Sequence, residues 1–377
     1  MAVSRLRMML RRELEAPQDL RRFGTGWISG TFAVLAGSVS LLLALANRYP
    51  DILLISELEV VRQHPAFQAA IYFVLIAAYA LSILSLILRD NKTLGIFAMT
   101  LTLAASLLGS LPPRHVGSIG VSVGLDYFVL NTLFIGFLFV PFERMVPHRR
   151  DQSIFRTEWR EDLFYYLVSS LLIQVLTYLT LAPSRVLTTT VDLSGVRALM
   201  AGLPWVVQLL LVMFLTDFTQ YWVHRLFHQV PALWRFHAVH HSAVAMDWLA
   251  GARMHIIEVI VLRSLTATPM FVLGFEPSVV QAYILIVYLW SAFVHANVEV
   301  NLGWLEGWIV VPRFHHWHHG IEREAIDVNF AIHFPIIDRM FGTYHMPEDR
   351  WPEGYGIGGH PVPNGYIAQF LYPLRRG

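Results

Sequence analysis

Long apolar stretches recur along this chain of 377 residues, and they constrain its fold more than any other feature. Hydrophobic residues make up 55% of the sequence and charged residues only 15%, which is outside the usual balance of a soluble globular domain. Six stretches are each about long enough to cross a hydrocarbon core as a helix: residues 27–47, 66–88, 94–111, 125–142, 163–183 and 204–223. A further pair, residues 259–275 and 279–294, is divided by Gly274, Glu276 and Pro277 and predicts a helical hairpin. The sequence therefore predicts an all-α, polytopic integral membrane protein of about eight spans.

Basic residues are distributed unequally between the two sides of this predicted topology. Six arginines precede the first span, and we expect this segment to be an uncleaved leader because it has no small-residue cleavage site at the right distance. The connections on the same side contain 13 basic residues, leader included, and those on the other side contain five. Since basic residues accumulate in cytoplasmic connections, the N-terminus is expected in the cytoplasm.

The chain is expected to divide into two domains near an arginine-rich connection at residues 144–162. Residues 1–143 form an N-terminal membrane domain of about four spans, for which the sequence indicates no role. Residues 144–377 contain 13 of the 17 histidines in the stretch from His224 to His345, and they end in a tail rich in proline and glycine, which cannot be a helix. If residues 259–294 turn back as a hairpin, these histidines emerge on the cytoplasmic side, in a helical cap made from residues 224–258 and 300–345.

Three dense groups of histidine fall within 96 residues of the second domain. They are HRLFH with His224 and His228, HAVHH with His237, His240 and His241, and HHWHH with His315, His318 and His319. Residues i, i+3 and i+4 share one face of a helix, so each HxxHH motif is expected to present three imidazoles to one point. Crowded neutral imidazoles would leave many buried nitrogens unsatisfied unless something binds them. Eight such nitrogens are too many for one tetrahedral zinc ion, so we expect a polynuclear site for iron, zinc or copper.

The predicted span at residues 204–223 contains an ionisable residue, Asp217, on the same helical stripe as the first histidine group. Asp217, Tyr221, His224 and His228 are spaced so that they form one narrow stripe on the helix. Charged groups inside a membrane span are costly and usually mark function. We expect Asp217 to accept a hydrogen bond from the far nitrogen of a metal-bound imidazole, with Tyr221 beside it in the catalytic site. The alternative is a helix-capping or structural carboxylate that is paired with an arginine such as Arg225.

The remaining histidines differ in their expected roles. His295 lies at the inner end of the last span, at the depth of the histidine groups, and is expected to bind metal. His255 lies three residues before Glu258, and either a ligand role or a supporting catalytic role fits it. His316 adjoins a ligand but points about 100° away around the helix, which favours a supporting role. The isolated His64, His115, His148 and His360 are assigned no role, and His333 and His345 are left unassigned.

Several classes of protein are excluded or disfavoured by what the sequence lacks. It contains no cysteine, which excludes disulfides, thiolate metal sites, cysteine-ligated iron–sulfur clusters and a cysteine nucleophile. A net charge of +1 gives no electrostatic reason to expect nucleic acid as a partner. The sequence has no HExxH motif of a zinc hydrolase and no HPGG haem motif of a fused cytochrome b5. Electrons for a redox reaction would therefore come from a separate protein.

The order of the motifs resembles the fatty acid hydroxylase superfamily, also called the sterol desaturase family. HxxxH, HxxHH, a lone HxN at the exit of a span and a second HxxHH are followed by NFAIHFPIIDRMFGTY, and the resemblance covers roughly residues 204–348. RMHIIE is similar to the family's HPxE box, with Ile256 in place of the proline, and Glu299 stands where some members have a second histidine. The resemblance implies a bacterial-type membrane protein with a non-haem di-iron site, and Asn297 of the HxN motif as a catalytic candidate. The iron ligands that it implies are His224, His228, His237, His240, His241, His295, His315, His318 and His319.

The same resemblance implies an O2-dependent monooxygenase that hydroxylates an aliphatic position of a lipid, such as a sterol or a fatty acyl chain. Desaturation at the same di-iron site is an alternative, because the position of the substrate carbon decides between the two outcomes. A second alternative is a histidine-ligated zinc membrane protein without oxygenase activity. The expected partners are a membrane lipid and a separate electron donor, which could be a cytochrome b5-like protein, a ferredoxin or a reductase. The expected location is a bacterial inner membrane, with the histidine groups on the cytoplasmic face.

Overall fold

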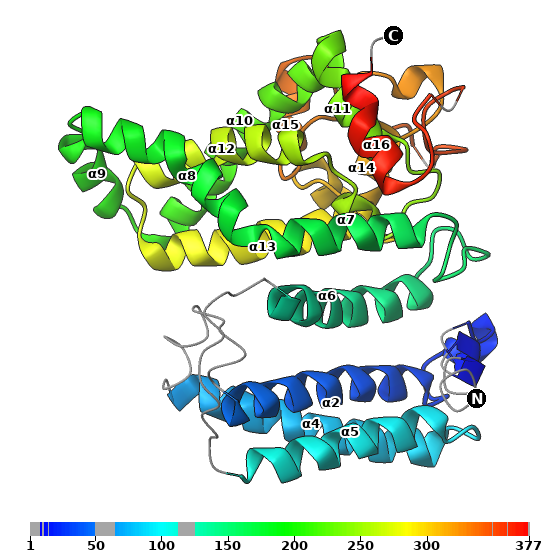
Figure 1. Ribbon diagram of the computed structural model, residues 1–377. Helices are drawn as coiled ribbons and strands as arrows, with labels where there is room; N and C mark the ends of the chain where they lie inside the picture. The colour runs from blue at the N-terminus through cyan, green and yellow to red at the C-terminus, as the bar shows by residue number, and fades with distance from the viewer. Residues whose placement is uncertain are drawn as a thin grey trace. The chain divides into compact units, whose positions relative to one another are not determined.

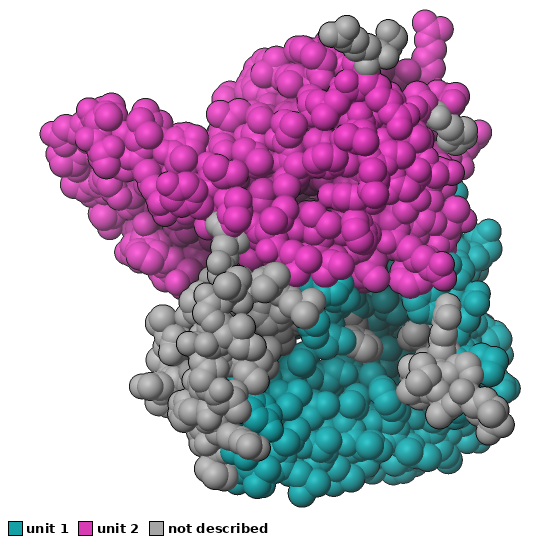
Figure 2. Space-filling view, in the orientation of Figure 1, with its two compact units in different colours: residues 1–155 teal, residues 156–377 magenta. Residues whose placement is uncertain are grey.

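The computed structural model describes residues 8–49 apart from 10 and 14, 65–111, 125–359 apart from 349, and 361–375. His64, His115 and His360, to which the sequence assigns no role, lie outside these residues. The described part of the chain is helical, with one isolated β-bridge between Gly320 and Tyr355, so the all-α prediction is confirmed. The chain divides into two compact units, residues 1–155 and 156–377 (Figure 2), and the connection up to residue 155 is thus grouped with the N-terminal unit.

Unit 1 is built from long apolar helices that pack through small residues. In its described residues these are α2 (Trp27–Arg48), α4 (Pro65–Leu88), α5 (Thr93–Gly109) and α6 (Leu125–Met145). Trp27, Ala33 and Val34 of α2 pack against Leu94 and Ala98 of α5. A Cβ atom at Gly30 of α2 would collide with side chains of α4 and α5, so this helix crossing requires glycine.

Unit 2 begins with two helices that form a bent pair and continues with a packed group of three. The pair is α7 (Trp159–Leu171) and α8 (Ile173–Thr190), which meet at 60°, and α9 (Ser194–Ala201) follows. The group of three is α10 (Trp205–Gln229), α12 (Ile256–Val272) and α13 (Pro277–His295). Val212 of α10, Met270 of α12 and Val279 of α13 belong to one buried apolar cluster. The chain reverses between α12 and α13 at Gly274, whose φ of 75° lies in the left-handed region that favours glycine.

The apolar stretches of the sequence all lie in these helices. Among the described residues, α2, α4, α10 and α13 are each long and apolar enough to cross a membrane, and the bent pair of α7 and α8 would add a fifth span. Helix α5 is apolar but shorter. A membrane protein is therefore plausible, and the figure of about eight spans and the orientation of the histidines stay predictions.

Short helices and loops make up the rest of unit 2 and gather around the C-terminal ends of α10 and α13 (Figure 1). They include α11 (Pro231–His241), α14 (Pro312–His318), α15 (Pro335–Met340) and α16 (Tyr366–Leu371). The first three each begin with proline, whose fixed φ suits the first turn of a helix and whose missing N–H is not needed there. We call this region the cap, and it carries two of the three histidine groups on α11 and α14.

Candidate metal centre

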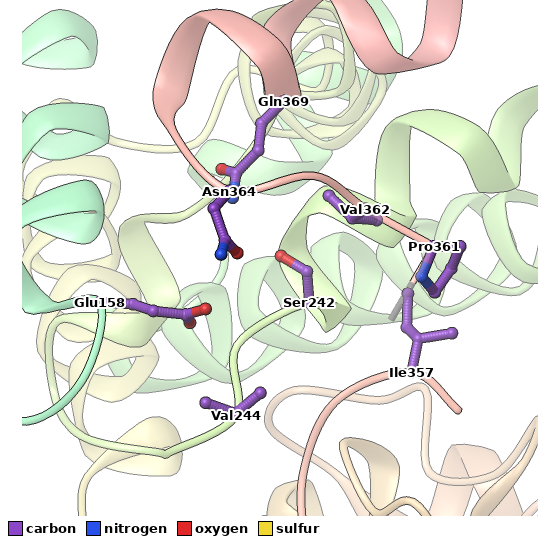
Figure 3. A pocket seen from close by; sticks show the side chains of 8 residues that line it. All are labelled: Glu158, Ser242, Val244, Ile357, Pro361, Val362, Asn364 and Gln369. Carbon is purple, nitrogen blue, oxygen red and sulfur yellow. The ribbon is translucent and has the colours of Figure 1, made fainter. Parts of the chain in front are cut away.

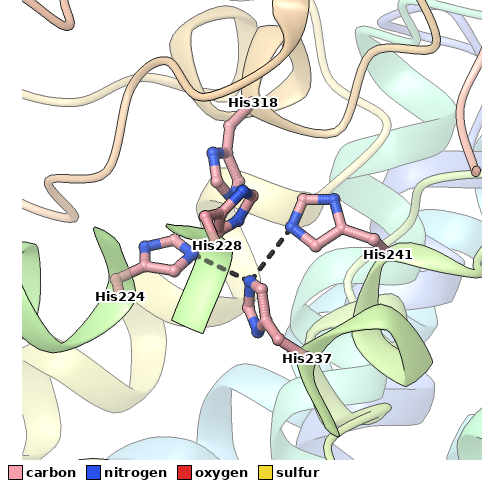
Figure 4. Close-up of side chains that lie close together, drawn as sticks. All are labelled: His224, His228, His237, His241 and His318. Atoms are coloured by element: carbon pink, nitrogen blue, oxygen red, sulfur yellow. Dashed lines mark hydrogen bonds between the residues drawn. The ribbon is translucent and has the colours of Figure 1, made fainter. Parts of the chain in front are cut away.

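The nine histidines that were expected to bind metal form two adjacent groups in unit 2. The five-histidine cluster consists of His224, His228, His237, His241 and His318 (Figure 4). The four-histidine cluster consists of His240, His295, His315 and His319. Within each cluster, every histidine offers one ring nitrogen, and these nitrogens all lie within 4.8 Å of one another. The two clusters touch through His241 and His319, whose rings are stacked with their centroids 4.4 Å apart.

Each HxxHH motif contributes to both clusters, so the expectation that one motif presents three imidazoles to one point is wrong. On α11, His237 and His241 join the five-histidine cluster and His240 joins the other. On α14 the division is reversed, since His318 alone belongs to the five-histidine cluster. The physical reason is the angle of about 100° between successive residues of a helix. Positions i and i+4 lie about 40° apart and can share one ion, whereas i+3 and i+4 diverge.

The outer nitrogens of four cluster histidines are held by backbone carbonyls. The donor and acceptor pairs are His224 with Phe330, His240 with Arg253, His295 with Ser291, and His318 with Val328, at Nδ1–O distances of 2.7 to 3.1 Å. A carbonyl oxygen can only accept a hydrogen bond, so each Nδ1 carries the proton. The lone pair of each Nε2 then faces the interior of its cluster, which is the arrangement that metal-bound imidazoles require.

Several Nε2 atoms lie close to one another inside the clusters. The Nε2 atom of His237 lies 3.0 Å from that of His224 and 3.1 Å from that of His241, as the dashed lines in Figure 4 mark. In the other cluster, the Nε2 atoms of His295 and His315 are 3.1 Å apart. Two nitrogens that bind one ion at about 2.1 Å and a right angle would be separated by about 3.0 Å. The spacing therefore fits imidazoles that converge on a cation.

Burial keeps the cap histidines neutral. We use this name for His237, His240, His241, His315, His318 and His319, whose exposed fractions are between 1% and 5%. Desolvation, together with neighbouring histidines, holds the pKa of each well below its ordinary value. Both ring nitrogens of His319 and the Nε2 of His318 are buried and find no hydrogen-bond partner among the described residues. Neutral, unpartnered imidazole nitrogens are the form that binds metal.

Glu258 on α12 supports the five-histidine cluster, and sequence reasoning did not give it this role. One oxygen of its carboxylate, which is 2% exposed, lies 2.5 Å from the Nδ1 of His237. A carboxylate at this position fixes the tautomer of the imidazole and raises its basicity as a ligand. The signal available in the sequence was an acidic, ionisable residue in the first turn of an apolar helix that packs into the interior of the protein.

A buried network of ion pairs fixes the segment whose carbonyl holds His240. Arg253, which is fully buried, pairs with Asp162 and with Glu158, the latter at 2.9 Å. Arg156 pairs with Asp162 and with Asp247, to which its Nε is bonded at 2.8 Å. Removing one partner from such a network leaves a buried charge uncompensated, so the network holds Arg253 in one position. The partners are up to 95 residues apart, and no local pattern in the sequence connects them.

Asp217 has a different partner from the one expected. Its carboxylate is fully buried and accepts hydrogen bonds from the backbone N–H groups of Ile332, His333 and Phe334 at 2.8 to 3.0 Å. The predicted bond to an imidazole is absent among the described residues, because the Nδ1 of His224 is already bonded to Phe330. The expected alternative, a pair with Arg225, is not observed either. Asp217 therefore positions the loop that follows Phe330.

Tyr221 and Asn297 are both buried near the clusters. The hydroxyl of Tyr221 lies 3.0 Å from the Oγ1 of Thr343 and accepts a hydrogen bond from Arg225 at 2.9 Å. The ring of Tyr221 packs against Phe330, which also contacts His224. Asn297, two residues after His295, is 4% exposed. A catalytic role for either residue stays a prediction.

His255 and His316 lie outside both clusters and make structural hydrogen bonds. The Nδ1 of His255 accepts the backbone N–H of Ile257 and so caps α12, and its Nε2 donates to the carbonyl of Phe370. Both nitrogens are thus occupied, which corrects the expectation of a ligand or catalytic role. His316 is bonded to the carbonyl of Ala296 and to the hydroxyl of Tyr355. Glu299 is exposed and belongs to neither cluster.

Comparisons with known proteins identify the same region of the chain. Residues 209–343 match the family model described as fatty acid hydroxylase. Ornithine lipid hydroxylase OlsE of Rhizobium tropici is 32% identical over 181 residues, which are 46% of this chain and 52% of that protein. The human alkylglycerol monooxygenase is 32% identical over 146 residues, covering 39% of this chain and 32% of the relative. Methylsterol monooxygenase 1-2 of Arabidopsis thaliana is 30% identical over 147 residues, covering 37% and 46%.

The chain thus spans between about a third and a half of the length of these relatives. No solved structure matches it significantly. The matched region contains most of α10, all of α11 to α14 and every histidine of the two clusters.

Proposed function

We propose that this chain, whose residues 209–343 match the fatty acid hydroxylase family model, is an O2-dependent monooxygenase that hydroxylates an aliphatic carbon of a membrane lipid at a non-haem di-iron centre. The observation that carries the proposal is the pair of adjacent histidine clusters, with five and four imidazoles. Imidazole nitrogen suits iron, and two adjacent ligand sets fit a centre with two ions.

In this proposal the five-histidine cluster holds one iron ion and the four-histidine cluster holds the other. Iron would supply the capacity to activate O2, so that one oxygen atom enters a C–H bond and the other is reduced to water by two electrons and two protons from a separate donor. Five imidazoles would leave one position open on a six-coordinate ion, and four would leave two. The four-histidine cluster is therefore the better candidate for the side that faces O2 and substrate.

The protein residues around the clusters have three tasks in this proposal. The backbone carbonyls and Glu258 fix the imidazole tautomers before metal binds. The near-complete burial of the cap histidines excludes bulk water from the reacting atoms. Apolar side chains such as Phe330, whose ring lies 5.0 Å from that of His228, surround the ligands with hydrocarbon. Such surroundings suit an aliphatic lipid substrate.

The relatives support hydroxylation over desaturation, because those named above are hydroxylases or monooxygenases. Their names differ in the lipid, so we propose only a lipid substrate that reaches the centre from the bilayer. We also propose that the protein is inserted in a bacterial inner membrane with the clusters at the cytoplasmic face. A cytochrome b5-like protein, a ferredoxin or a reductase would deliver electrons there.

The test is lipid mass spectrometry of cells that express the protein under 18O2, combined with metal analysis of the purified protein. We expect a lipid that is heavier by one 18O atom and about two iron ions per chain. His240→Ala should abolish both, since it removes a ligand of the four-histidine cluster. His148→Ala, which changes a histidine of unit 1, should leave both unchanged.

Three results would contradict the proposal. A lipid that is lighter by two hydrogens, without the 18O product, would indicate desaturation. Stoichiometric zinc in protein expressed with ample iron, together with no consumption of O2, would indicate a zinc protein. Wild-type iron content in His240→Ala would remove this histidine from the metal site.

A further inference from the structure

A cavity of about 260 Å³ lies beside the metal centre, within unit 2 (Figure 3). Its walls come from the start of α7, the loop after α11 and the C-terminal tail that precedes and includes α16. One side is apolar and is formed by Val244, Ile357, Pro361 and Val362. The other side is polar and is formed by Glu158, Ser242, Asn364 and Gln369.

The polar side presents hydrogen-bond acceptors to the cavity. Figure 3 shows the side-chain ends of Glu158, Ser242 and Asn364 pointing toward the same space. Gln369 is 1% exposed, and its Nε2 donates to Glu161 at 3.0 Å, which fixes the orientation of the amide. Its Oε1 is buried and finds no hydrogen-bond donor among the described residues. A buried acceptor without a partner is costly, and a ligand that donates a hydrogen bond would satisfy it.

The charges around the cavity favour a cation. Glu158 belongs to the buried network of ion pairs described above, which contains three carboxylates and two guanidinium groups. Glu161, which is bonded to Gln369, adds a fourth carboxylate. These four carboxylates and two guanidinium groups together carry a formal charge of −2, and every residue that lines the cavity is acidic or neutral.

We propose that this cavity binds a primary alkylammonium group. An ammonium group has three N–H donors and no acceptor, which matches the carboxylate of Glu158, the Oε1 of Gln369 and the amide oxygen of Asn364. The methylene groups attached to the amine would lie against Val244 and Val362. Two sources carry this chemistry, the head group of an amine-containing membrane lipid and a free soluble amine.

The cavity is next to the proposed di-iron centre, but amine binding requires neither iron nor O2. Ser242 directly follows His241, and Arg253 links Glu158 to the carbonyl that holds His240. A lipid bound by its amine would therefore have its head group beside Ser242, the residue that directly follows the proposed metal ligand His241. The inference goes beyond the proposed function and can be tested on protein that has no oxygenase activity.

The first probe is n-butylamine, with n-butanol as the control that lacks the charge. Binding to the purified full-length protein in detergent can be followed by saturation-transfer NMR at pH 7.5. We expect saturable binding of n-butylamine, and at least tenfold weaker binding of n-butanol. Equal binding of the two compounds would overturn the proposal.

Variants locate the binding site. Glu158→Gln removes the lining carboxylate and should weaken n-butylamine binding at least tenfold. Glu276→Gln makes the same chemical change at an exposed position outside the cavity and should have no effect. Because Glu158 also pairs with Arg253, Asn364→Leu at an exposed lining position serves as a second variant and should weaken binding at least threefold. Wild-type affinity in Asn364→Leu, or in folded Glu158→Gln, would overturn the proposal.

A second probe distinguishes the two sources. Detergent-solubilised protein is incubated with phosphatidylethanolamine or with its N-acetyl derivative, which lacks the ammonium group, and bound lipid is measured by native mass spectrometry. Retention of phosphatidylethanolamine alone, reduced by Glu158→Gln, would assign the cavity to a lipid head group. Equal retention of both lipids, with binding of n-butylamine intact, would assign it to a soluble amine. If neither probe depends on its ammonium group, the proposal is wrong.

Discussion

Replacing Glu258 tests how the five-histidine cluster is built. The carboxylate is 2% exposed, and the Nδ1 of His237 is its neighbour at 2.5 Å, so Glu258→Leu leaves this imidazole without its acceptor. Loss of such a partner typically lowers metal affinity by about 10- to 100-fold, which corresponds to roughly 1.4 to 2.7 kcal/mol. A hydrogen bond to a charged group contributes about 1.5 to 3 kcal/mol, so two independent arguments give the same range. Glu258→Gln keeps a neutral acceptor and should lose about tenfold or less.

The assay is iron retention by purified protein during titration with a ferrous chelator, paired with thermal unfolding of the metal-free protein. The two measurements should move in opposite directions. The second oxygen of Glu258 is buried and without a hydrogen-bond partner among the described residues, so the charge costs free energy when no ion is bound. Metal-free Glu258→Gln should therefore be as stable as the wild type or more stable, while its iron is released more easily.

Glu276→Gln is the matched control and should leave both measurements unchanged, because this carboxylate is exposed at the start of α13. The reasoning is refuted if Glu258→Leu retains iron as firmly as the wild type. It is equally refuted if Glu258→Gln destabilises the metal-free protein while its iron retention is unaffected, since the carboxylate would then serve only the fold.

Three further predictions concern other parts of the centre. His318→Ala should lower bound iron from about two ions per chain to one or fewer by elemental analysis, and unchanged iron would exclude His318 as a ligand. In the wild type, three backbone N–H groups donate to the carboxylate of Asp217, and Asp217→Asn would direct an N–H donor of its own at them. This variant should lower the free energy of unfolding of unit 2 by roughly 2 to 4 kcal/mol, measured by denaturant unfolding. A decrease of less than about 0.5 kcal/mol would contradict the prediction. Burial lowers the pKa of His333 to about 4, and with an unfolded value of about 6.5 its contribution to stability is complete above pH 6.5 and is lost as the pH falls toward 4. The wild type should therefore lose about 2 kcal/mol more stability than His333→Leu between pH 7.5 and pH 5, and equal losses would contradict the assignment.

Helical spacing was sufficient to predict which neighbouring histidines converge, because it is a local property. His224 and His228 are four residues apart on one helix, and the same holds for His237 and His241, so their convergence follows from the helical repeat alone. The apolar stretches predicted the long helices for the same reason. The division of each HxxHH motif also follows from the helical repeat, but which cluster each histidine joins depends on which side of α11 faces α14.

The partners of the clusters could not be predicted because they are distant in the sequence. His224 is bonded to a carbonyl that lies 106 residues further along the chain, and Asp217 to backbone N–H groups 115 to 117 residues away. Backbone acceptors also have no side-chain identity, so no motif marks them. His255 was misjudged for a related reason, since a histidine beside an acidic residue has the same local pattern whether it binds an ion or caps a helix.

The reversed division of the two HxxHH motifs makes the clusters interdependent. Helix α11 contributes two histidines to the five-histidine cluster and one to the four-histidine cluster. Helix α14, together with His319 directly after it, contributes one histidine to the five-histidine cluster and two to the four-histidine cluster. A shift of either helix would therefore change the ligand distances in both clusters together. Each helix is anchored by a contact outside itself, α11 through Glu258 and the carbonyl of Arg253, and α14 through the carbonyl of Val328. If both clusters hold metal, binding of the first ion would fix both helices and lower the entropic cost of binding the second, so the two sites should fill cooperatively.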